Sequence, residues 1–272
     1  MATISSDSAL GAAFAAARAE GRPALIPYLT AGFPTFEISL EALRAADARC
    51  DIIEVGVPFS DPLADGPTIQ RSTFAALAQG MTLPKTLDLI RAAKLSKPVV
   101  LFSYLNPVRR YGLARLLVDA AEVGVAGLLL TDLPAGGDPE FERTVAASPI
   151  DLIRLLAPTT SDARVAEAVR DASGFLYLVA RLGVTGASRE LASGLEEYVA
   201  RIRRHTSLPL AVGFGISTPA QATAVAAMAD GVVVGSAFVR VIEQYAGTPE
   251  METKLEALAR ELKSGALQGR VR

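Results

Sequence analysis

Short, continuously apolar runs alternate with longer amphipathic stretches along most of the chain. Eight such runs have the length of β-strands, and they span residues 24–30, 51–57, 98–104, 127–131, 151–156, 174–180, 208–213 and 230–234. Continuous apolar runs are typical of parallel strands that are covered by other elements on both faces. The pattern therefore predicts a parallel sheet whose strands are separated by helices.

The stretches between the apolar runs carry helix signals. Residues 35–49 place apolar side chains at roughly helical spacing, and residues 108–124 continue in the same way up to Gly124, a helix-stop signal. Ser161 is positioned as an N-cap, and Pro219 lies near the start of another helical stretch, where its missing N–H costs least. We expect one helix after each strand.

Eight strand–helix units favour a closed barrel, a single (β/α)8 TIM barrel, over the alternative of an open doubly wound sheet, which usually has fewer strands. Two further helices are expected outside the eight units. One lies within residues 1–22 and caps the barrel floor, and the other lies within 248–272 and ends in a tail, QGRVR. Because no linker-like segment interrupts the pattern, we expect residues 1–272 to form one domain.

Composition narrows the function classes. The 272 residues are 50% hydrophobic and 21% charged, with a net charge of −2, which indicates a globular protein with no footprint for nucleic acid or an acidic membrane. No apolar run is long enough for a membrane span, and the N-terminus lacks the features of a signal peptide. The only cysteine, Cys50, is expected to be a buried apolar residue in a reducing compartment, so the cytoplasm is the expected location.

Glu54 stands out because it lies in the middle of the apolar run 51–57. Burying a carboxylate is costly unless something compensates for it. One interpretation is a structural ion pair with an arginine from a neighbouring strand. The other, which a place inside a barrel mouth favours, is a general acid–base whose pKa is raised by desolvation.

The segment after this strand, PFSDPLADGP at 58–67, would reach over the barrel mouth. It contains Asp61 and Asp65. Aspartate also favours turns without any function. Asp65 is the better candidate for a second working carboxylate, whereas Asp61 is equally well explained as a turn former.

Glycine-rich segments follow three consecutive strands, and they are GVTG (183–186), GFGIS (213–217) and GSAF (235–238). Backbone N–H groups at helix N-termini bind anions, and the loops after strands seven and eight are the usual phosphate site of such barrels. Together they predict a phosphate ester substrate. GFGIST lacks the third glycine of a dinucleotide fingerprint, which argues against a nicotinamide cofactor.

Missing residue types restrict the chemistry further. None of the five lysines follows a strand, so a Schiff-base aldolase is not expected. With one histidine, His205, before strand seven, and one cysteine, the sequence predicts no metal site. With imine and metal chemistry not expected, the sequence predicts carboxylate acid–base chemistry on a phosphorylated substrate.

At this point the motifs resemble a known family. EVGVPFSDPLADGPTIQ (54–70) resembles the signature of tryptophan synthase α subunits, and shorter matches keep their order and spacing from about residue 24 to residue 240. These shorter matches are IPYLTAGFP, LFSYLNP, LLLTDLP, RLGVTG, GFGIS and VGSAFV. The resemblance implies a cofactor-free retro-aldol cleavage of indole-3-glycerol phosphate to indole and glyceraldehyde 3-phosphate, at the last stage of tryptophan biosynthesis.

The resemblance also implies roles for matching positions. Glu54 would be the general acid–base, Asp65 would bind the indole N–H and stabilise positive charge on the ring, and Tyr177 would shape the site. The substrate-binding positions are Gly186, Gly215, Gly235 and Ser236 for the phosphate, Thr185 beside them, and Phe214, Tyr28, Phe102, Leu129 and Ile69 around the indole. Core packing is the alternative for these apolar side chains, above all for Ile69 and Leu129.

Finally, the resemblance implies a partner. This would be a β subunit that carries pyridoxal phosphate and forms an αββα complex with this chain. The β subunit would receive indole through a tunnel. The cofactor belongs to the partner, so this chain is expected to hold none. Loops at Pro58–Asp61 and Asn106–Pro107 would face that partner, and Asp61 would then serve communication. The alternatives are a free-standing indole-releasing lyase, another phosphate-binding barrel enzyme, or a non-catalytic regulatory subunit. The presence of both Glu54 and Asp65 disfavours the non-catalytic subunit.

Overall fold

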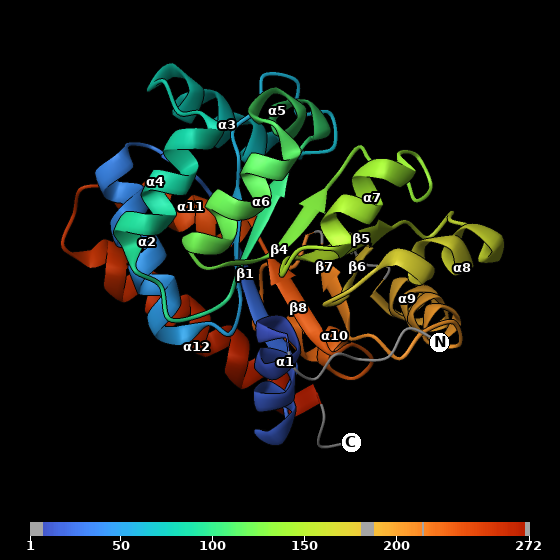
Figure 1. Ribbon diagram of the computed structural model, residues 1–272. Helices are drawn as coiled ribbons and strands as arrows, with labels where there is room; N and C mark the ends of the chain where they lie inside the picture. Colours follow the sequence, from blue (N-terminus) through green and yellow to red (C-terminus); the bar gives the residue numbers. More distant parts are fainter. Residues whose placement is uncertain (1–7, 181–187, 214, 270–272) are drawn as a thin grey trace.

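Eight parallel strands close into a barrel in the order in which they occur along the chain (Figure 1). The computed structural model describes residues 8–180, 188–213 and 215–269. The strands are β1 (Ala24–Thr30), β2 (Ile53–Gly56), β3 (Val99–Ser103), β4 (Val125–Leu130), β5 (Asp151–Leu156), β6 (Leu176–Val179), β7 (Leu210–Gly213) and β8 (Gly231–Val234). The predicted TIM barrel is therefore confirmed, and the open doubly wound alternative is excluded.

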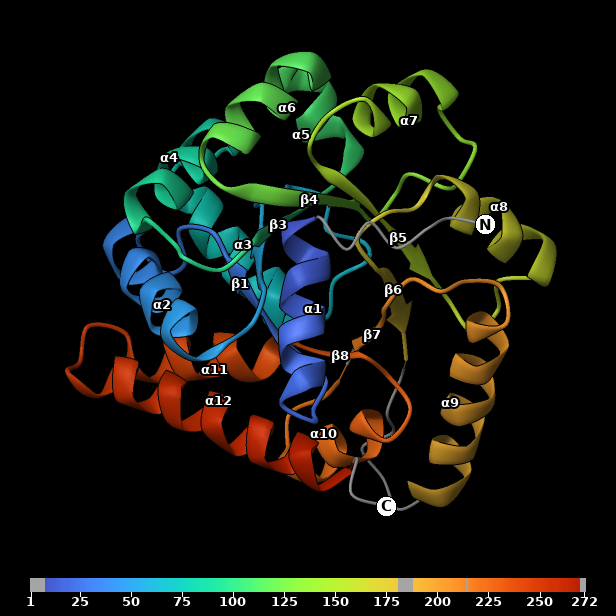
Figure 2. The same ribbon diagram turned by 60° about the horizontal axis from the view of Figure 1, so that its bottom comes forward.

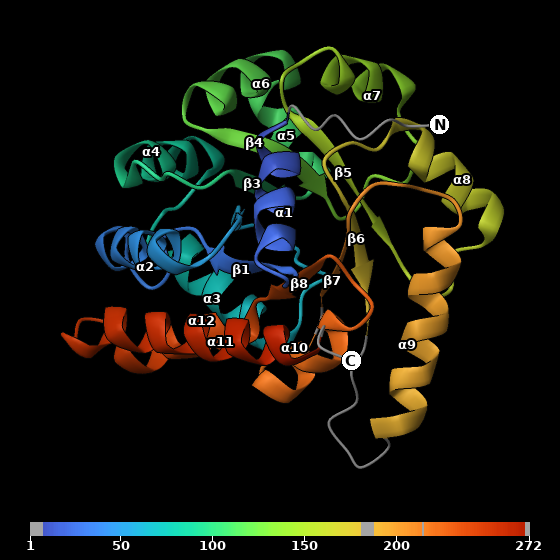
Figure 3. The same cartoon turned by 90° about the horizontal axis from the view of Figure 1, so that it is seen from below.

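The helices form a ring around the strands, as the view along the barrel shows (Figure 3). They are α1 (Ala9–Ala19), α2 (Phe36–Arg49), α3 (Pro67–Ala78), α4 (Leu83–Ala93), α5 (Leu105–Tyr111), α6 (Leu113–Glu122), α7 (Pro139–Ala146), α8 (Asp162–Asp171), α9 (Ser188–Arg203), α10 (Pro219–Ala226), α11 (Ser236–Tyr245) and α12 (Glu250–Gly269). None of the helices within the described ranges is long and apolar enough to cross a membrane.

Strand β1 is buried along its whole length even though it contains Pro27. A proline cannot donate a ladder hydrogen bond and is normally kept out of central strands. Here β1 pairs with β8 over Ala24–Pro27 and with β2 over Tyr28–Thr30, so Pro27 lies where the pairing changes from one neighbour to the other. The barrel accommodates the proline at this transition.

The two helices predicted outside the eight units are present. Helix α1 lies across the end of the barrel where the strands begin, and Figure 2 shows it in front of them. Its Leu10 and Phe14 are buried, and the Phe14 ring lies 5.4 Å from that of Phe175. Helix α12 packs along α2, α10 and α11 (Figure 2). The floor is therefore closed, and the opposite end, where the strands finish, is left for a site.

Local signals explain where several helices begin and end. The side chain of Thr35 caps α2 by accepting from the N–H of Ile38 at 3.3 Å, and Pro219 takes the first position of α10 as predicted. Ser161 is the N-cap of α8, but its side chain makes no capping hydrogen bond.

Three helix boundaries differ from the prediction. The single helix expected over 108–124 is two helices, because Gly112 has a φ of +94° and separates α5 from α6. Asn106 and Pro107, expected in a loop, lie in the first turn of α5. The first two residues of the expected tail continue α12 as far as Gly269, where the helix packs tightly on the backbone of Thr223, and residues 270–272 lie outside the described residues.

Candidate active site

Glu54 lies on β2 and is completely buried. Neither of its carboxyl oxygens has a hydrogen-bond partner among the residues that the structure describes. The interpretation as a structural ion pair required an arginine on a neighbouring strand. The buried arginine of the barrel wall, Arg154 on β5, instead pairs with Glu142 on α7. Glu54 is therefore a buried carboxyl group without a counter-ion in the described part of the chain.

This environment changes the protonation of Glu54. Burial raises its pKa from 4.5 to about 8, because a carboxylate in an apolar interior lacks the solvation that it has in water. The group is then mostly protonated near neutral pH. It can donate a proton and take one back without a large free-energy cost, as a general acid–base must.

Two buried tyrosines lie beside Glu54, and two glycines make room for them. Tyr28 is the partner of Glu54 in the β1–β2 register, and the pKa of Tyr177 lies well above its ordinary value because of burial and then the nearby Glu54 charge. A Cβ atom on Gly56 would lie 2.0 Å from the Tyr28 hydroxyl, and one on Gly213 would lie 2.1 Å from the Tyr177 hydroxyl. Gly213, predicted as part of a phosphate loop, therefore makes space for a tyrosine.

Asp65 lies in the loop between β2 and α3 and is half-buried. Burial raises its pKa from 3.8 to about 6, while the Tyr104 hydroxyl, 3.4 Å from Asp65 Oδ2, acts in the opposite direction by donating a hydrogen bond. The same hydroxyl accepts from the backbone N–H of Ala64 at 3.0 Å. Near neutral pH the site therefore combines a mostly protonated Glu54 with an ionised Asp65, and such a separation of two pKa values is typical of an acid–base site.

A cavity of about 220 Å³ joins these elements at the ends of the strands. It is lined by Tyr28, Asp65, Gly66, Ile69, Phe102, Tyr177, Gly215, Val233, Gly235 and Ser236. Helix α11 begins here, with Gly235 as its N-cap. Its free N–H groups and the positive end of its dipole favour an anion at this side of the cavity. Much of the remaining lining is aromatic and aliphatic. Tyr28 and Phe102 meet edge-to-face with their centroids 5.2 Å apart, and Gly235 lies directly against Tyr28 and Ile69.

Most of the predicted site residues lie together around this cavity. Leu129 is fully buried beside Phe102 in the β3–β4 register and is not among the lining residues. Asp61 is exposed, and its carboxylate accepts a hydrogen bond from Ser60. Thr185, Gly186 and Phe214 lie outside the described residues.

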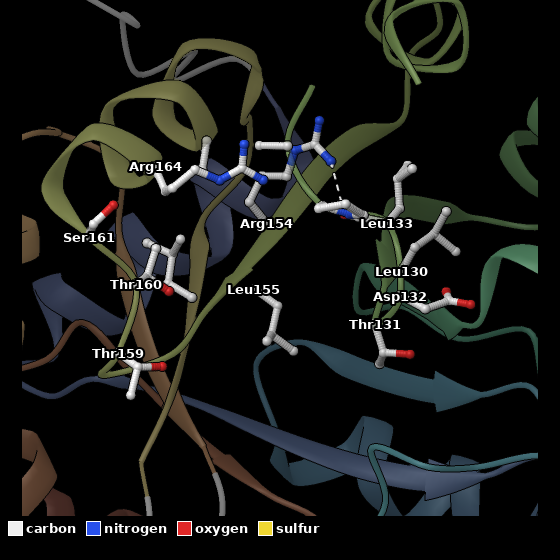
Figure 4. Close-up of a pocket in the computed structure, with 14 residues that line it drawn as sticks. Leu130, Thr131, Asp132, Leu133, Arg154, Leu155, Thr159, Thr160, Ser161 and Arg164 are labelled. Carbon is white, nitrogen blue, oxygen red and sulfur yellow. Dashed lines mark hydrogen bonds between the residues drawn. The ribbon is translucent and has the colours of Figure 1, made fainter. Parts of the chain in front are cut away.

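A larger cavity, of about 490 Å³, lies elsewhere and contains none of the predicted site residues. Figure 4 shows residues 130–133 on one side of it and residues 159–164 on the other, with Arg154 and Leu155 of β5 between them. Arg154 is already engaged by Glu142 and by the carbonyl of Leu133, and Arg164 is paired with Glu167. The smaller cavity is the candidate site because it is lined by Asp65, whose pKa is raised, and by Tyr28 and Tyr177, the two tyrosines beside Glu54. Glu54 itself is not among the lining residues.

Several lining or supporting residues were not predicted. They include Tyr104, Gln70, Gly66, Val233 and Gly56. A signal for Tyr104 was available, because residues 102 and 104 of an extended strand end lie on the same face. Gln70 acts through contacts with Pro62 and Asp65, and Gly56 through its close approach to Tyr28; the sequence pattern carries no signal for these contacts. Within the described ranges, no cluster of His, Cys, Asp and Glu is arranged to hold a metal ion.

The fold and the cavity define a class of protein, namely a βα barrel whose strand-end cavity combines a carboxyl group of raised pKa with a helix N-terminus that favours an anion. Comparison with known proteins makes this more specific. The family model described as tryptophan synthase alpha chain matches residues 14–267. A tryptophan synthase alpha chain from Methanosarcina mazei is 49% identical over 247 residues, which cover 90% of this chain and 89% of that one.

Solved structures agree with this assignment. Tryptophan synthase from M. tuberculosis, in an open form with BRD0059 bound, superposes with a TM-score of 0.86 at 37% identity, covering 96% of this chain and 100% of that chain. Tryptophan synthase subunit alpha from Legionella pneumophila superposes with a TM-score of 0.83 at 32% identity, covering 96% and 98%.

This chain belongs to the tryptophan synthase alpha chain family. It is an enzyme subunit of tryptophan biosynthesis that cleaves indole-3-glycerol phosphate and releases indole, and its partner is the tryptophan synthase beta subunit. The function predicted from the motifs is thereby confirmed. The alternative hypotheses of another phosphate-binding barrel enzyme and of a non-catalytic subunit are excluded.

Proposed function

We propose that Glu54 and Asp65 carry out the cleavage without a metal or cofactor in this chain. The observation that supports this most strongly is the fully buried Glu54, which has no hydrogen-bond partner among the described residues. Its pKa of about 8 keeps it mostly protonated near neutral pH, where Asp65, with a pKa of about 6, is ionised. A retro-aldol cleavage needs one group that donates a proton and later removes one, and a second group that stabilises positive charge.

The proposed sequence begins with protonation of the indole ring. Glu54 gives its proton to C3 of the indole, which makes the ring cationic and able to accept electrons. The carboxylate of Asp65 binds the indole N–H and stabilises this charge, which is absent from the substrate and develops only during the reaction. Charge stabilisation of this kind lowers the barrier rather than merely tightening binding.

Cleavage then restores both groups. The ionised Glu54 removes the proton from the glycerol hydroxyl next to the ring, and the carbon–carbon bond to C3 breaks. Its electron pair returns to the ring, while the oxygen becomes the aldehyde of glyceraldehyde 3-phosphate. Glu54 is protonated again and indole is neutral, so no redox partner or imine is required.

Substrate binding is proposed to divide along the cavity. The N–H groups around Gly215, Gly235 and Ser236 hold the phosphate, together with Thr185 and Gly186. The indole lies against Tyr28, Ile69 and Phe102, with Phe214 and Leu129 nearby and Tyr177 shaping the site around Glu54. The mixed lining of the cavity, which combines a helix N-terminus with aromatic side chains, supports these roles.

We further propose that the beta subunit supplies pyridoxal phosphate, that the two subunits form an αββα heterotetramer in the cytoplasm, and that indole passes between them through a tunnel. Residues 1–272 are proposed to act as one domain. The segments at Pro58–Asp61 and Asn106–Pro107 lie at the strand-end side of the barrel next to the site, which supports their role in contacting the partner.

The experiment is to measure indole release from indole-3-glycerol phosphate by this chain, alone and with saturating beta subunit, without added metal. We expect slow release by the chain alone and strong acceleration by the partner. An equal rate in both conditions would identify a free-standing lyase. No indole in either condition would contradict the proposed mechanism.

A further inference from the structure

The loop that carries Asp65 is held from outside by two side chains. Within the loop, the N–H of Asp65 donates to the carbonyl of Pro62 at 3.1 Å, which closes a turn over residues 62–65. Tyr104, after β3, holds the N–H of Ala64 at 3.0 Å. From the other side, the Nε2 atom of Gln70 on α3 donates to the carbonyl of Asp65 at 3.0 Å and to that of Pro62 at 3.3 Å.

The chemistry of Gln70 suits this position. A primary amide nitrogen carries two N–H groups, so one atom can hold two carbonyls. Because both contacted atoms are carbonyl oxygens, only the nitrogen end of the amide can face them. Gln70 therefore connects both ends of the turn to α3, whose own backbone hydrogen bond from Gln70 N to Gly66 O starts the helix.

The carboxylate of Asp65 needs such support. The hydrogen bond that it accepts from the Tyr104 hydroxyl measures 3.4 Å, which is long for a hydroxyl donating to a carboxylate. The direction of the carboxylate is therefore determined mainly by the backbone of residues 62–65, and that backbone is held by Gln70. Gln70 itself is half-buried and is not among the residues that line the cavity.

We propose that Gln70 is a positioning residue for the cleavage reaction, which directs the Asp65 carboxylate at the indole N–H by fixing the carbonyls of Pro62 and Asp65. This inference rests on the proposed role of Asp65. Gln70 does not touch the substrate. Losing its two hydrogen bonds leaves substrate binding largely intact and weakens the stabilisation of charge that develops during the reaction, so the effect falls on kcat rather than on KM.

The test compares Gln70→Met with the matched control Gln79→Met, in the complex with the beta subunit. Methionine keeps the length and flexibility of glutamine without its donors, and Gln79 is an exposed residue just after α3. We expect Gln70→Met to lower kcat by about tenfold with KM changed by less than about threefold. Gln79→Met should match the wild type. Thermal unfolding of both variants checks the fold. Gln70→Glu serves as a second Gln70 variant, because it has the same shape but turns an acceptor towards the carbonyls.

A double-mutant cycle separates positioning from a general structural role. In an Asp65→Asn background, Gln70→Met should lower the residual kcat by less than about twofold, because there is no charge left to direct. Equal losses in both backgrounds, or wild-type kcat in both Gln70 variants, would overturn the inference. If Asp65→Asn alone kept the wild-type kcat, the proposed role of Asp65 would fail as well, and this outcome is distinct from a failure of Gln70 alone.

Discussion

Two carboxyl groups near the start of β2, the half-buried Asp51 and the fully buried Glu54, have opposite properties. Asp51, just before the strand, accepts hydrogen bonds from Arg22 at 2.6 and 3.0 Å, from Lys263 at 3.0 Å and from the N–H of Leu25 at 2.8 Å. Burial alone would raise its pKa, but these partners hold the pKa below 3.8. Glu54, within the strand, has no such partner in the part of the chain that the structure describes, and burial raises its pKa to about 8.

The comparison shows that burial by itself does not mark a catalytic carboxylate. Both groups are removed from water, and the difference lies in the charges and N–H groups around them. At the barrel floor, arginine and lysine side chains meet Asp51 and make it part of the scaffold. At the mouth, Glu54 is surrounded by apolar and tyrosine side chains, so its proton is available for chemistry. Four substitutions test this contrast between the two carboxyl groups.

Glu54→Gln should have the largest effect. The amide has nearly the same shape but neither donates a proton to carbon nor removes one from a hydroxyl, so we expect indole release to fall on the order of a thousandfold. The measurement is the steady-state rate with saturating beta subunit. The variant should fold, as checked by circular dichroism. A folded variant with the wild-type rate would remove Glu54 from the mechanism.

Asp65→Asn should come second. An asparagine can still accept from the indole N–H, but it has no negative charge with which to stabilise the cationic ring. We expect kcat to fall by about a hundredfold, as when one stabilising group is removed from a transition state. The same indole assay measures the effect. A loss confined to KM, with kcat unchanged, would show that Asp65 only binds the substrate.

Asp51→Asn tests the scaffold side of the comparison. It leaves Arg22, which is only 4% exposed, without its main partner. We expect the free energy of unfolding to fall by about 2 kcal/mol, less than for a fully buried pair, because Glu20 still contacts Arg22. Urea unfolding measures the change. Indole release per folded molecule should be unaffected, and a large loss of kcat at unchanged stability would contradict the purely structural role of Asp51.

Tyr104→Phe should have the smallest effect, on the pH profile. The proposed mechanism requires an ionised Asp65 and a protonated Glu54, so the rate should rise through about pH 6 and fall through about pH 8. Removing the Tyr104 hydroxyl removes a hydrogen bond that favours ionised Asp65, which raises the pKa of Asp65. The acid limb should therefore move to higher pH by less than about one unit, while the alkaline limb stays in place. Movement of the alkaline limb instead would contradict this assignment.

Much of the fold could be predicted from the sequence because strand and helix signals are local. Continuous apolar runs located all eight strands, and Pro219 and Thr35 lie at helix starts where their chemistry fits. The predicted helix boundaries were wrong where a tertiary contact or a single backbone angle sets the end of a helix. Gly112 divides one predicted helix into two, and α12 extends beyond its predicted end because its last turn packs on α10.

The candidate site also has features that the sequence predicts and features that it does not. The positions of Glu54 in an apolar strand and of Asp65 in the loop after it could be predicted from the sequence alone. Both depend only on the neighbouring residues along the chain. Only the tertiary structure decided that Glu54 has no counter-ion in the described residues, that Arg154 turns to Glu142, and that Tyr104 and Gln70 hold the loop. The physical reason is that a pKa depends on the charges, dipoles and solvent within a few ångströms, and barrel closure brings those groups together from strands and helices far apart in the sequence.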